Sequence, residues 1–192
     1  MNKLILDTST DYLYVSVIKN DKDVFTEVLY GKNNHSEHLI GIVEKGLSGM
    51  PAKELDEIIV GIGPGSYTGV RVGLTVGKVL AWTIKKPLKI ISSLSLICSG
   101  YLDCDGIYGV SSVAKKGHVY GKIIEVKDGK IKVLFDDNFL TDEEFVEVLS
   151  KYNATNISKD NYKFNNLIID KLSNKVEEVH EVVPNYLRKA NS

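Results

Sequence analysis

The residues best suited to chemistry lie in a glycine-rich loop between a predicted strand and a predicted helix. The loop reads Gly63-Pro64-Gly65-Ser66. A loop of this kind can present backbone N–H groups to a phosphate, and the dipole of the following helix favours the anion. The spacing fits neither the Walker nor the dinucleotide pattern, because the required lysine and third glycine are missing from their positions. Phosphate binding and a simple turn therefore both stay open.

A second polar group follows the first predicted strand and reads Asp7-Thr8-Ser9-Thr10. A carboxylate and hydroxyl groups at the end of a strand can hold magnesium or phosphate. The same residue types also favour a tight turn, which is the simpler interpretation. The candidate phosphate or nucleotide site combines both segments and consists of Asp7, Thr8, Ser9, Gly63, Gly65 and Ser66.

Other catalytic or metal-binding patterns are weak. His35 and His38 are spaced to share one helix face, but a third zinc ligand is not evident nearby, so we expect no metal site. The sequence contains no nucleophile elbow, Cys–His pair or paired-carboxylate motif. Glu143-Glu144 and Glu177-Glu178 are interpreted as solvated helix charges.

Small residues recur every four positions through the helix that follows the glycine-rich loop. They are Gly65, Gly69, Gly73, Gly77 and Ala81. Four residues are close to one helical turn, so these positions form a ridge of small side chains along the helix. Each interior glycine costs about 1 kcal/mol relative to alanine, so something must require the space. The ridge can pack closely on its own sheet or on a helix of another chain, and composition alone favours neither.

The elements that must position these residues follow from hydrophobic periodicity and turn residues. In the first half we predict strands at residues 3–8, 12–18, 24–29, 57–62 and 88–91. Helices are predicted at residues 36–47, from the glycine-rich loop to 85, and at 92–101. Asn34 and Glu37 are spaced as a capping box for the first of these helices.

The second half begins with another meander. Strands are predicted at residues 107–114, 118–126 and 131–135, with Asp128-Gly129 as a hairpin turn. A helix capped by acidic residues runs from Thr141 to about Lys151. Beyond it, a strand and a helix are expected within residues 167–172 and 176–183. The order of elements indicates an α/β fold with an N-terminal lobe at residues 1–102 and a C-terminal lobe at 103–192, whose last segment packs back on the first lobe.

Composition narrows the function classes. Of the 192 residues, 43% are apolar, and the 24 lysines and arginines balance 25 aspartates and glutamates. This excludes a disordered polyelectrolyte and a strongly basic nucleic-acid binder. Only Arg71 and Arg188 are arginines, so any RNA would be held mainly by a partner. Two cysteines, no leader sequence and no long apolar span predict a cytoplasmic protein without a membrane role.

Several motifs together resemble the TsaB (YeaZ) family. The matching stretches are residues 4–10 (LILDTST), 35–37 (HSE) and above all 63–74 (GPGSYTGVRVGL). Residues 114–120 (AKKGHVY) and 184–188 (PNYLR) are weaker matches. The resemblance is strong over residues 1–98 and thin afterwards.

The resemblance implies an actin-like ATPase (ribonuclease H-like) fold of two related lobes with mixed sheets, the second abbreviated. It implies a heterodimer with the paralogue TsaD, which transfers threonylcarbamoyl to N6 of the adenosine beside the anticodon of tRNA, and an association with the ATPase TsaE. Family members pair through their first two helices. The positions that match here are His38, Leu39, Ile42, Thr68, Gly69, Val72, Gly73, Thr75 and Val76. On this basis the glycine ridge is expected to contact the partner chain.

The resemblance also implies that this chain is non-catalytic and has no intrinsic cofactor. Whether ATP or ADP binds at the interface of the complex stays open. This sequence agrees, because all 16 glycines lie at or before Gly129, and the second lobe lacks the glycine pair that grips adenosine in active relatives of the fold. Val113 stands where family members often have an aspartate. Three alternatives stay open: a small ATP-dependent phosphotransferase using Asp7 and the glycine-rich loop, a homodimeric structural protein, and a peptidase, for which the sequence offers no catalytic group.

Overall fold

The computed structural model describes residues 1–31 and 35–187. Its first sheet has the strand order β10-β5-β4-β1-β2-β3. The bounds are β1 (Lys3–Asp7), β2 (Tyr12–Lys19), β3 (Lys22–Tyr30), β4 (Glu57–Gly61), β5 (Leu88–Ile91) and β10 (Asn174–Lys175). Strands β1 to β3 form an antiparallel meander, whereas β4 and β5 run parallel to β1. The five strands predicted in the first half are confirmed.

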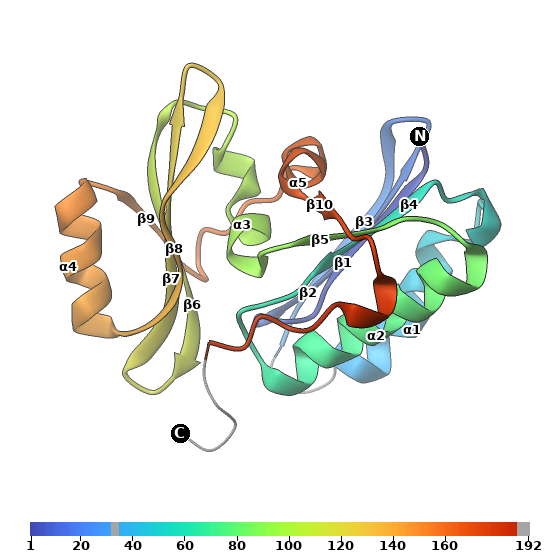
Figure 1. Ribbon diagram of the computed structural model, residues 1–192, viewed down its shortest axis with the longest axis horizontal. Helices are drawn as coiled ribbons and strands as arrows, with labels where there is room; N and C mark the ends of the chain where they lie inside the picture. The colour runs from blue at the N-terminus through green and yellow to red at the C-terminus, as the bar shows by residue number, and fades with distance from the viewer. Residues whose placement is uncertain (32–34, 188–192) are drawn as a thin grey trace.

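Two helices, α1 (His35–Gly46) and α2 (Tyr67–Ile84), cover one face of this sheet (Figure 1). Their apolar stripes pack with the strands in one core that includes Leu39, Ile42 and Leu74. Helix α2 begins at its N-cap Ser66, whose side chain accepts a hydrogen bond from the N–H of Gly69. It ends at Lys85, which adopts a left-handed conformation. The capping box predicted for α1 at Asn34 lies outside the described residues, and a short turn, η1 (Ala52–Glu54), leads into β4.

The second sheet has the order β8-β7-β6-β9, with the bounds β6 (Gly106–Lys115), β7 (His118–Lys127), β8 (Lys130–Thr141) and β9 (Thr155–Ile157). Helix α4 (Asp142–Tyr152) lies on its outer face (Figure 1). The predicted cap is confirmed, because Thr141 and Glu144 form a reciprocal capping box. Strand β8 continues six residues beyond the predicted end at Phe135, and β9 was not predicted.

The two sheets repeat one topology. In each, three antiparallel strands are followed by a helix and then by a strand parallel to the first strand of the meander. The first lobe adds α2 and β5 to this unit, whereas the second lobe stops at β9. The predicted α/β fold of two related lobes with mixed sheets, the second abbreviated, is therefore confirmed.

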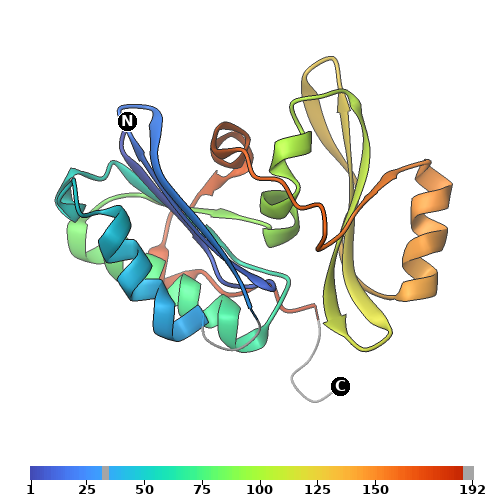
Figure 2. The ribbon, with the colours of Figure 1, turned by 180° about the vertical axis from the view of Figure 1, so that it is seen from behind.

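Three short elements fill the space between the sheets: α3 (Ser93–Ile97), η2 (Ser99–Tyr101) and α5 (Asn166–Leu172). Figure 2 shows α3 and α5 in this position from the opposite side of the molecule. Their apolar side chains join residues of both sheets in one core, which includes Ile5, Tyr14, Leu96, Val110 and Ile169. Because this core is shared, the division predicted after residue 102 stays a prediction.

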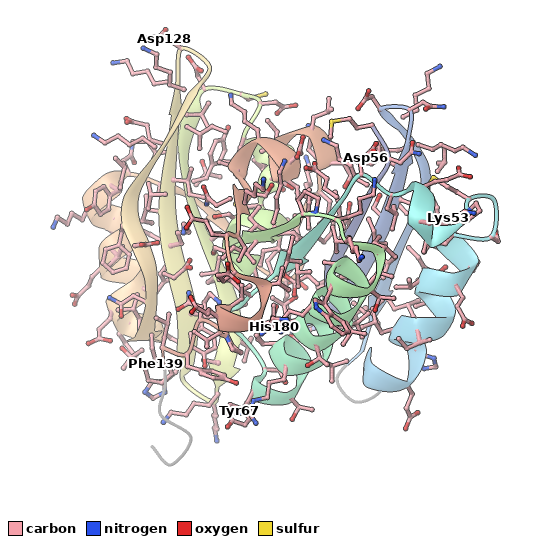
Figure 3. All side chains as sticks on the ribbon, turned by 45° about the vertical axis from the view of Figure 1, so that its right-hand side comes forward. Lys53, Asp56, Tyr67, Asp128, Phe139 and His180 are labelled. Atoms are coloured by element: carbon pink, nitrogen blue, oxygen red, sulfur yellow. The ribbon has the colours of Figure 1, made fainter. Side chains whose placement is uncertain are left out.

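The chain returns to the first lobe after α5. Strand β10 pairs with β5, and the N–H of Val176 donates to the carbonyl of Leu88 at 2.9 Å. Residues 176–187, which we call the return segment, then run beside α2 and include η3 (Val179–Glu181). In Figure 3, His180 marks η3 next to the green α2, and Tyr67 marks the start of α2. Of the strand and helix predicted within residues 167–172 and 176–183, the first range forms the helix α5 and the second contains the short η3, while the strand β10 lies between the two predicted ranges.

Four charged side chains connect α5 to the first sheet. Lys3 on β1 lies 3.1 Å from Glu57 on β4 and 2.5 Å from Asp170 on α5. Lys89 on β5 contacts the same two carboxylates at 3.0 and 2.7 Å. Burial lowers the pKa of both lysines, but hydrogen bonds and attraction to Asp170 and Glu57 outweigh it and raise each pKa. Every charge in the group therefore has an opposite neighbour.

Among the helices that the structure describes, none is both long and apolar enough to cross a membrane.

Candidate functional site

The polar turn after β1 is buried where the first strand meets the start of α2. Asp7, Thr8 and Ser9 are each 2% exposed or less. The N–H of Ser9 donates to Oδ1 of Asp7 at 2.6 Å, and the Ser9 hydroxyl bonds to the same carboxylate. The Thr8 hydroxyl donates to the carbonyl of Gly69 at 2.6 Å. The turn is thus tied both to itself and to α2.

The glycine-rich loop lies directly against this turn. The N–H of Ser66 donates to the Ser9 carbonyl at 2.6 Å, and the N–H of Gly63 donates to the Ser93 hydroxyl at 2.9 Å. That hydroxyl lies 2.6 Å from the Ser9 hydroxyl. The structure brings the two predicted segments together, but their groups bond to one another. A phosphate would have to displace these bonds, and nucleotide binding here stays a prediction.

The ridge of small residues on α2 packs against the same turn and β4. A Cβ added at Gly65 would overlap the carbonyl of Ser9, and one at Gly69 would overlap the carbonyl of Thr8. At Gly73 it would lie 2.6 Å from Oγ1 of Thr8, and at Gly77 it would overlap Val60. The expectation that the ridge contacts a partner chain is wrong. The glycines are needed because α2 lies against the backbone of Thr8 and Ser9 and against the side chains of Thr8 and Val60 in its own lobe.

The predicted pairing residues fall into two groups. Leu39, Ile42, Gly69 and Gly73 are buried in the first lobe, so their assignment to a partner surface is corrected. His38, Thr68 and Thr75 are exposed, while Val72 and Val76 are half-buried where they pack on the core shared with α1. The four residues of the first group are buried because the stripe of apolar and small residues that repeats with the helical period on α1 and α2 faces the sheet.

The solvent face of α1 and α2 also contains residues that sequence reasoning missed. Ile40 is 49% exposed on α1, and Val79 and Trp82 are 57% and 65% exposed on α2. Gly41 follows His38 by three residues, and a Cβ added there meets nothing within 4 Å. An apolar residue on the polar side of an amphipathic helix is the signal that marks such a face.

A second polar cluster joins the lobes beside the glycine-rich loop. Lys122 on β7 is 5% exposed and lies 3.1 Å from Asp137 and 2.9 Å from Asp136. Asp137 also accepts hydrogen bonds from Ser92 at 2.9 Å and from the side chain of Asn185 at 3.0 Å. The N–H of Asn185 donates to the carbonyl of Ile62 at 2.8 Å. Asn185 thereby connects both lobes through the return segment.

Burial and charge act in opposite directions on the two aspartates of this cluster. Burial raises the pKa of Asp137, although Lys122 and Ser92 oppose the effect. The hydrogen bond from Lys122 lowers the pKa of the more exposed Asp136. The buried Asp137 carboxylate therefore depends on its hydrogen-bond donors. No spacing in the sequence predicts this cluster, because Lys122 and Asp137 lie on different strands.

Metal-binding residues do not gather in the part of the chain that the structure describes, where no group of three or more His, Cys, Asp or Glu side chains has ligand geometry. His38 lies exposed on α1, and the side chain of His35 is outside the described set. Cys98 is buried and Cys104 is exposed, and both are free thiols.

Comparison with known protein families gives a consistent match. The family model described as TsaD, tRNA N6-adenosine threonylcarbamoyltransferase, matches residues 29–170. The tRNA threonylcarbamoyladenosine biosynthesis protein TsaB of Bacillus subtilis is 31% identical over 153 residues, which are 79% of this chain and 67% of that protein. The TsaB protein of Haemophilus influenzae is 33% identical over 95 residues, 48% of this chain and only 39% of that protein.

A solved structure has the same fold over almost the whole chain. It is a Pseudomonas aeruginosa protein described as uncharacterized with similarity to peptidase YEAZ, with a TM-score of 0.78 and 20% identity. The superposition covers 97% of this chain and 99% of the other. Both lobes and the return to the first sheet are therefore included in one shared architecture.

Proposed function

This chain belongs to the family of the tRNA threonylcarbamoyladenosine biosynthesis protein TsaB, and from this premise we propose that it is a non-catalytic subunit of the threonylcarbamoyl transfer machinery. It pairs with a TsaD-type transferase and stabilises the transferase in a conformation competent for transfer to tRNA. The transferase provides the catalytic groups, and this chain provides a surface. We place the complex in the cytoplasm, with TsaE as a further component and tRNA held mainly by the partners.

The observation that carries the non-catalytic role is the closed polar turn. To bind phosphate groups, the first turn and the glycine-rich loop would need backbone N–H groups that point away from other protein acceptors. Here the N–H groups of Ser9, Gly63 and Ser66 donate to groups of the same lobe, and α2 lies against the Thr8 carbonyl. A buried donor that already has a partner gains little from a ligand. We therefore propose no resident nucleotide in the isolated chain, and place any ATP or ADP at the interface.

The pairing surface that we propose is the solvent face of α1 and α2. It has the exposed positions predicted from the resemblance, His38, Thr68 and Thr75, and the apolar Ile40 and Val79 beside them. Gly41 leaves a low point on α1, which allows a partner helix to approach closely. The glycine ridge supports this surface indirectly, because it fixes the height of α2 above the sheet.

The decisive experiment measures pairing by light scattering on a sizing column, with this chain alone and mixed with TsaD from the same organism, with and without ATP. The test variant is Gly41→Arg, which adds a long charged side chain where the folded monomer has free space. The matched control is Val146→Arg on α4, where the replaced side chain is 59% exposed on the far side of the molecule. Melting temperatures establish that both variants fold.

We expect a heterodimer peak for the original chain and for Val146→Arg, and its loss for Gly41→Arg at unchanged melting temperature. Pairing that survives Gly41→Arg would exclude this face. A stable homodimer that does not exchange with TsaD would favour the homodimeric structural protein. No complex under any condition, together with saturable ATP binding by the monomer, would favour the small phosphotransferase.

A further inference from the structure

Arg71 on α2 is held in a fixed position by two tyrosines, and among residues 1–31 and 35–187 it has no acidic partner. Its guanidinium carbon lies 3.8 Å from the ring centre of Tyr67, and its Nε donates to the Tyr186 hydroxyl at 2.6 Å. Its Nη2 donates to the Tyr67 hydroxyl, and the two tyrosine rings stack with centres 5.0 Å apart. Two neutral oxygens therefore orient the guanidinium without neutralising its charge.

Arg71 keeps hydrogen-bond donors and a positive charge that a ligand could use. Within the described ranges, no carboxylate lies within 4.0 Å of its nitrogens, although Lys3, Lys89 and Lys122 all have such partners. A guanidinium has five N–H donors in a planar fork, which matches the two oxygens of a carboxylate. Ordering a long side chain costs conformational entropy. Because Tyr67 and Tyr186 already order the Arg71 side chain in the free protein, a ligand that binds it loses less affinity to this cost.

A groove begins at Arg71 and runs between α2 and the return segment. Its volume is about 400 Å³, and its lining consists of Arg71, Leu74, Thr75, Lys78, Val182, Val183, Pro184 and Tyr186. The floor and outer wall are mainly apolar, and Val183 is 71% exposed. Among the described residues that line it, none is acidic. The acidic side chains of the return segment, Glu177, Glu178 and Glu181, precede the lining part.

Lys78 provides a second positive charge in the groove. Its Nζ donates to the carbonyls of His180 and Val182 at 2.9 and 3.1 Å, so it too is oriented by neutral oxygens. Lys78 follows Arg71 by seven residues on the same helix, which places the two cations about two helical turns, roughly 10 Å, apart. The groove thus has an apolar middle between two fixed positive charges.

We propose that this groove binds an acidic amphipathic helix of a partner protein. Two carboxylates spaced by two turns would contact Arg71 and Lys78, and the apolar side chains on the intervening turn would pack on Leu74, Val182 and Pro184. This is the helix-in-groove mode of recognition, with charge complementarity at both ends. The groove lies on the side of α2 opposite Val72 and Val76. It shares Thr75 with the pairing surface proposed above, but the two cations that carry this proposal, Arg71 and Lys78, are not part of that surface.

The test uses a fluorescein-labelled synthetic helix with two glutamates separated by two turns and two leucines on the turn between them. Fluorescence anisotropy measures its binding to the full chain. The control peptide has glutamine in place of both glutamates. The protein variants are Arg71→Gln, which removes the charge, and Arg71→Lys, which keeps the charge and removes the fork. Lys116→Gln, in the exposed turn between β6 and β7, is the matched control.

We expect saturable binding that weakens with salt, as ion pairs require. Arg71→Gln should weaken binding about tenfold or more, with Arg71→Lys intermediate and Lys116→Gln unchanged. The glutamine peptide should bind weakly and should not distinguish Arg71→Gln from the original chain, because the pair is then already broken. Pairing with TsaD should be the same for all variants, which separates this proposal from the proposed function.

Three results would overturn the proposal. One is the absence of saturable binding up to about 1 mM peptide, the upper limit for a weak specific contact. Another is equal binding of the glutamate peptide by Arg71→Gln, Arg71→Lys and Lys116→Gln at matched melting temperatures. Arg71 would then have only a structural role, as the hydrogen-bond donor to Tyr186. The third is tighter, Arg71-dependent binding of a labelled single-stranded oligouridine, which would make the groove an RNA contact instead.

Discussion

The contact between Thr8 and α2 determines how close the helix can lie to the sheet. The Thr8 hydroxyl bonds to the Gly69 carbonyl, and the Thr8 backbone occupies the place of a Gly69 side chain. Glycine normally weakens a helix relative to alanine. At this position the sign should reverse, because any side chain would separate α2 from the first strand.

We predict that Gly69→Ala lowers the free energy of unfolding by about 1–3 kcal/mol, the usual cost of overpacking. Gly41→Ala, at an open position of α1, should instead raise it by up to about 1 kcal/mol. Urea denaturation midpoints of both variants provide the measurement. If Gly69→Ala were as stable as Gly41→Ala, the close approach of α2 to Thr8 would be wrong.

At the residue scale the sequence identified the right positions but not their neighbours. The four-residue spacing from Gly65 to Gly77 was visible, and so was the polar turn at Asp7. What the spacing could not give was the surface that fills the space above Gly73, because Thr8 is distant in sequence. The family resemblance favours a contact between the glycine ridge and a partner chain, whereas in the structure the ridge contacts its own lobe. The pair Lys122 and Asp137 is not predictable from the sequence, because nothing in the local sequence distinguishes a lysine or an aspartate that forms a buried ion pair from one on the surface.

At the scale of elements, α5 depends on charge as well as on apolar packing. Ile169 is fully buried between the sheets, and Asp170, one residue later, reaches Lys3 and Lys89. Burial raises the pKa of Asp170, but hydrogen bonds from Lys3 and Lys89 outweigh it, so the net shift is downward. A carboxyl group whose pKa falls on folding stabilises the native state above its unfolded pKa. That stabilisation disappears as the pH falls through the folded pKa.

We predict that Asp170→Asn lowers the free energy of unfolding by about 1–3 kcal/mol at pH 7, below the value for a fully buried pair because Asp170 is partly exposed. The difference from the original chain should shrink as the pH falls below about 4, the ordinary pKa of an aspartate, because Asp170 with its lowered pKa becomes protonated only below that value. Urea midpoints as a function of pH measure the effect. Asp128→Asn, in the exposed turn labelled in Figure 3, is the control and should show little change. A loss that is independent of pH would show that shape rather than charge holds α5.

Predictability of the elements followed their amphipathic pattern. The alternation in β2 and the unbroken apolar run of β4 were sufficient for confirmed strands. The strand predicted at residues 131–135 ends too early because Asp136, Asp137 and Asn138 have low strand propensity. In the structure the register with β7 shifts at Asp136 and Asp137, and Asn138 resumes the pairing opposite Gly121. The three-residue β9 and the seven-residue α5 are held by contacts with distant segments, which local periodicity does not contain.

At the scale of the molecule, Asn185 fixes the two lobes relative to each other. Its backbone bonds to Ile62 of the first lobe, and its side chain bonds to Asp137 of the second. Asp137 is buried and has a raised pKa, so it relies on donors rather than on water. Two lobes joined at this point cannot separate without breaking buried hydrogen bonds.

We predict that Asn185→Asp replaces a donor with a second carboxylate and lowers the free energy of unfolding by about 1–3 kcal/mol. A carboxyl group whose pKa is raised in the folded state, such as Asp137, stabilises the fold fully below its unfolded pKa. That stabilisation is lost as the pH rises through the folded pKa. The loss should therefore be larger at pH 7 than at pH 4. Hydrogen exchange of residues 182–187 should accelerate in parallel. Asn138→Asp, exposed on β8, is the control, and equal exchange in both variants would contradict the role of Asn185.

The path of the return segment has a consequence for synthesis on the ribosome. The first sheet begins with residue 3, but Lys3 receives its Asp170 partner and β5 receives its β10 neighbour only after residues 170–175 have been made. An emerging first lobe therefore has an open sheet edge and an excess of positive charge at that edge. Contacts of such long sequence separation form slowly. Translation of the second lobe thus sets the earliest moment at which the first lobe can reach its final stability.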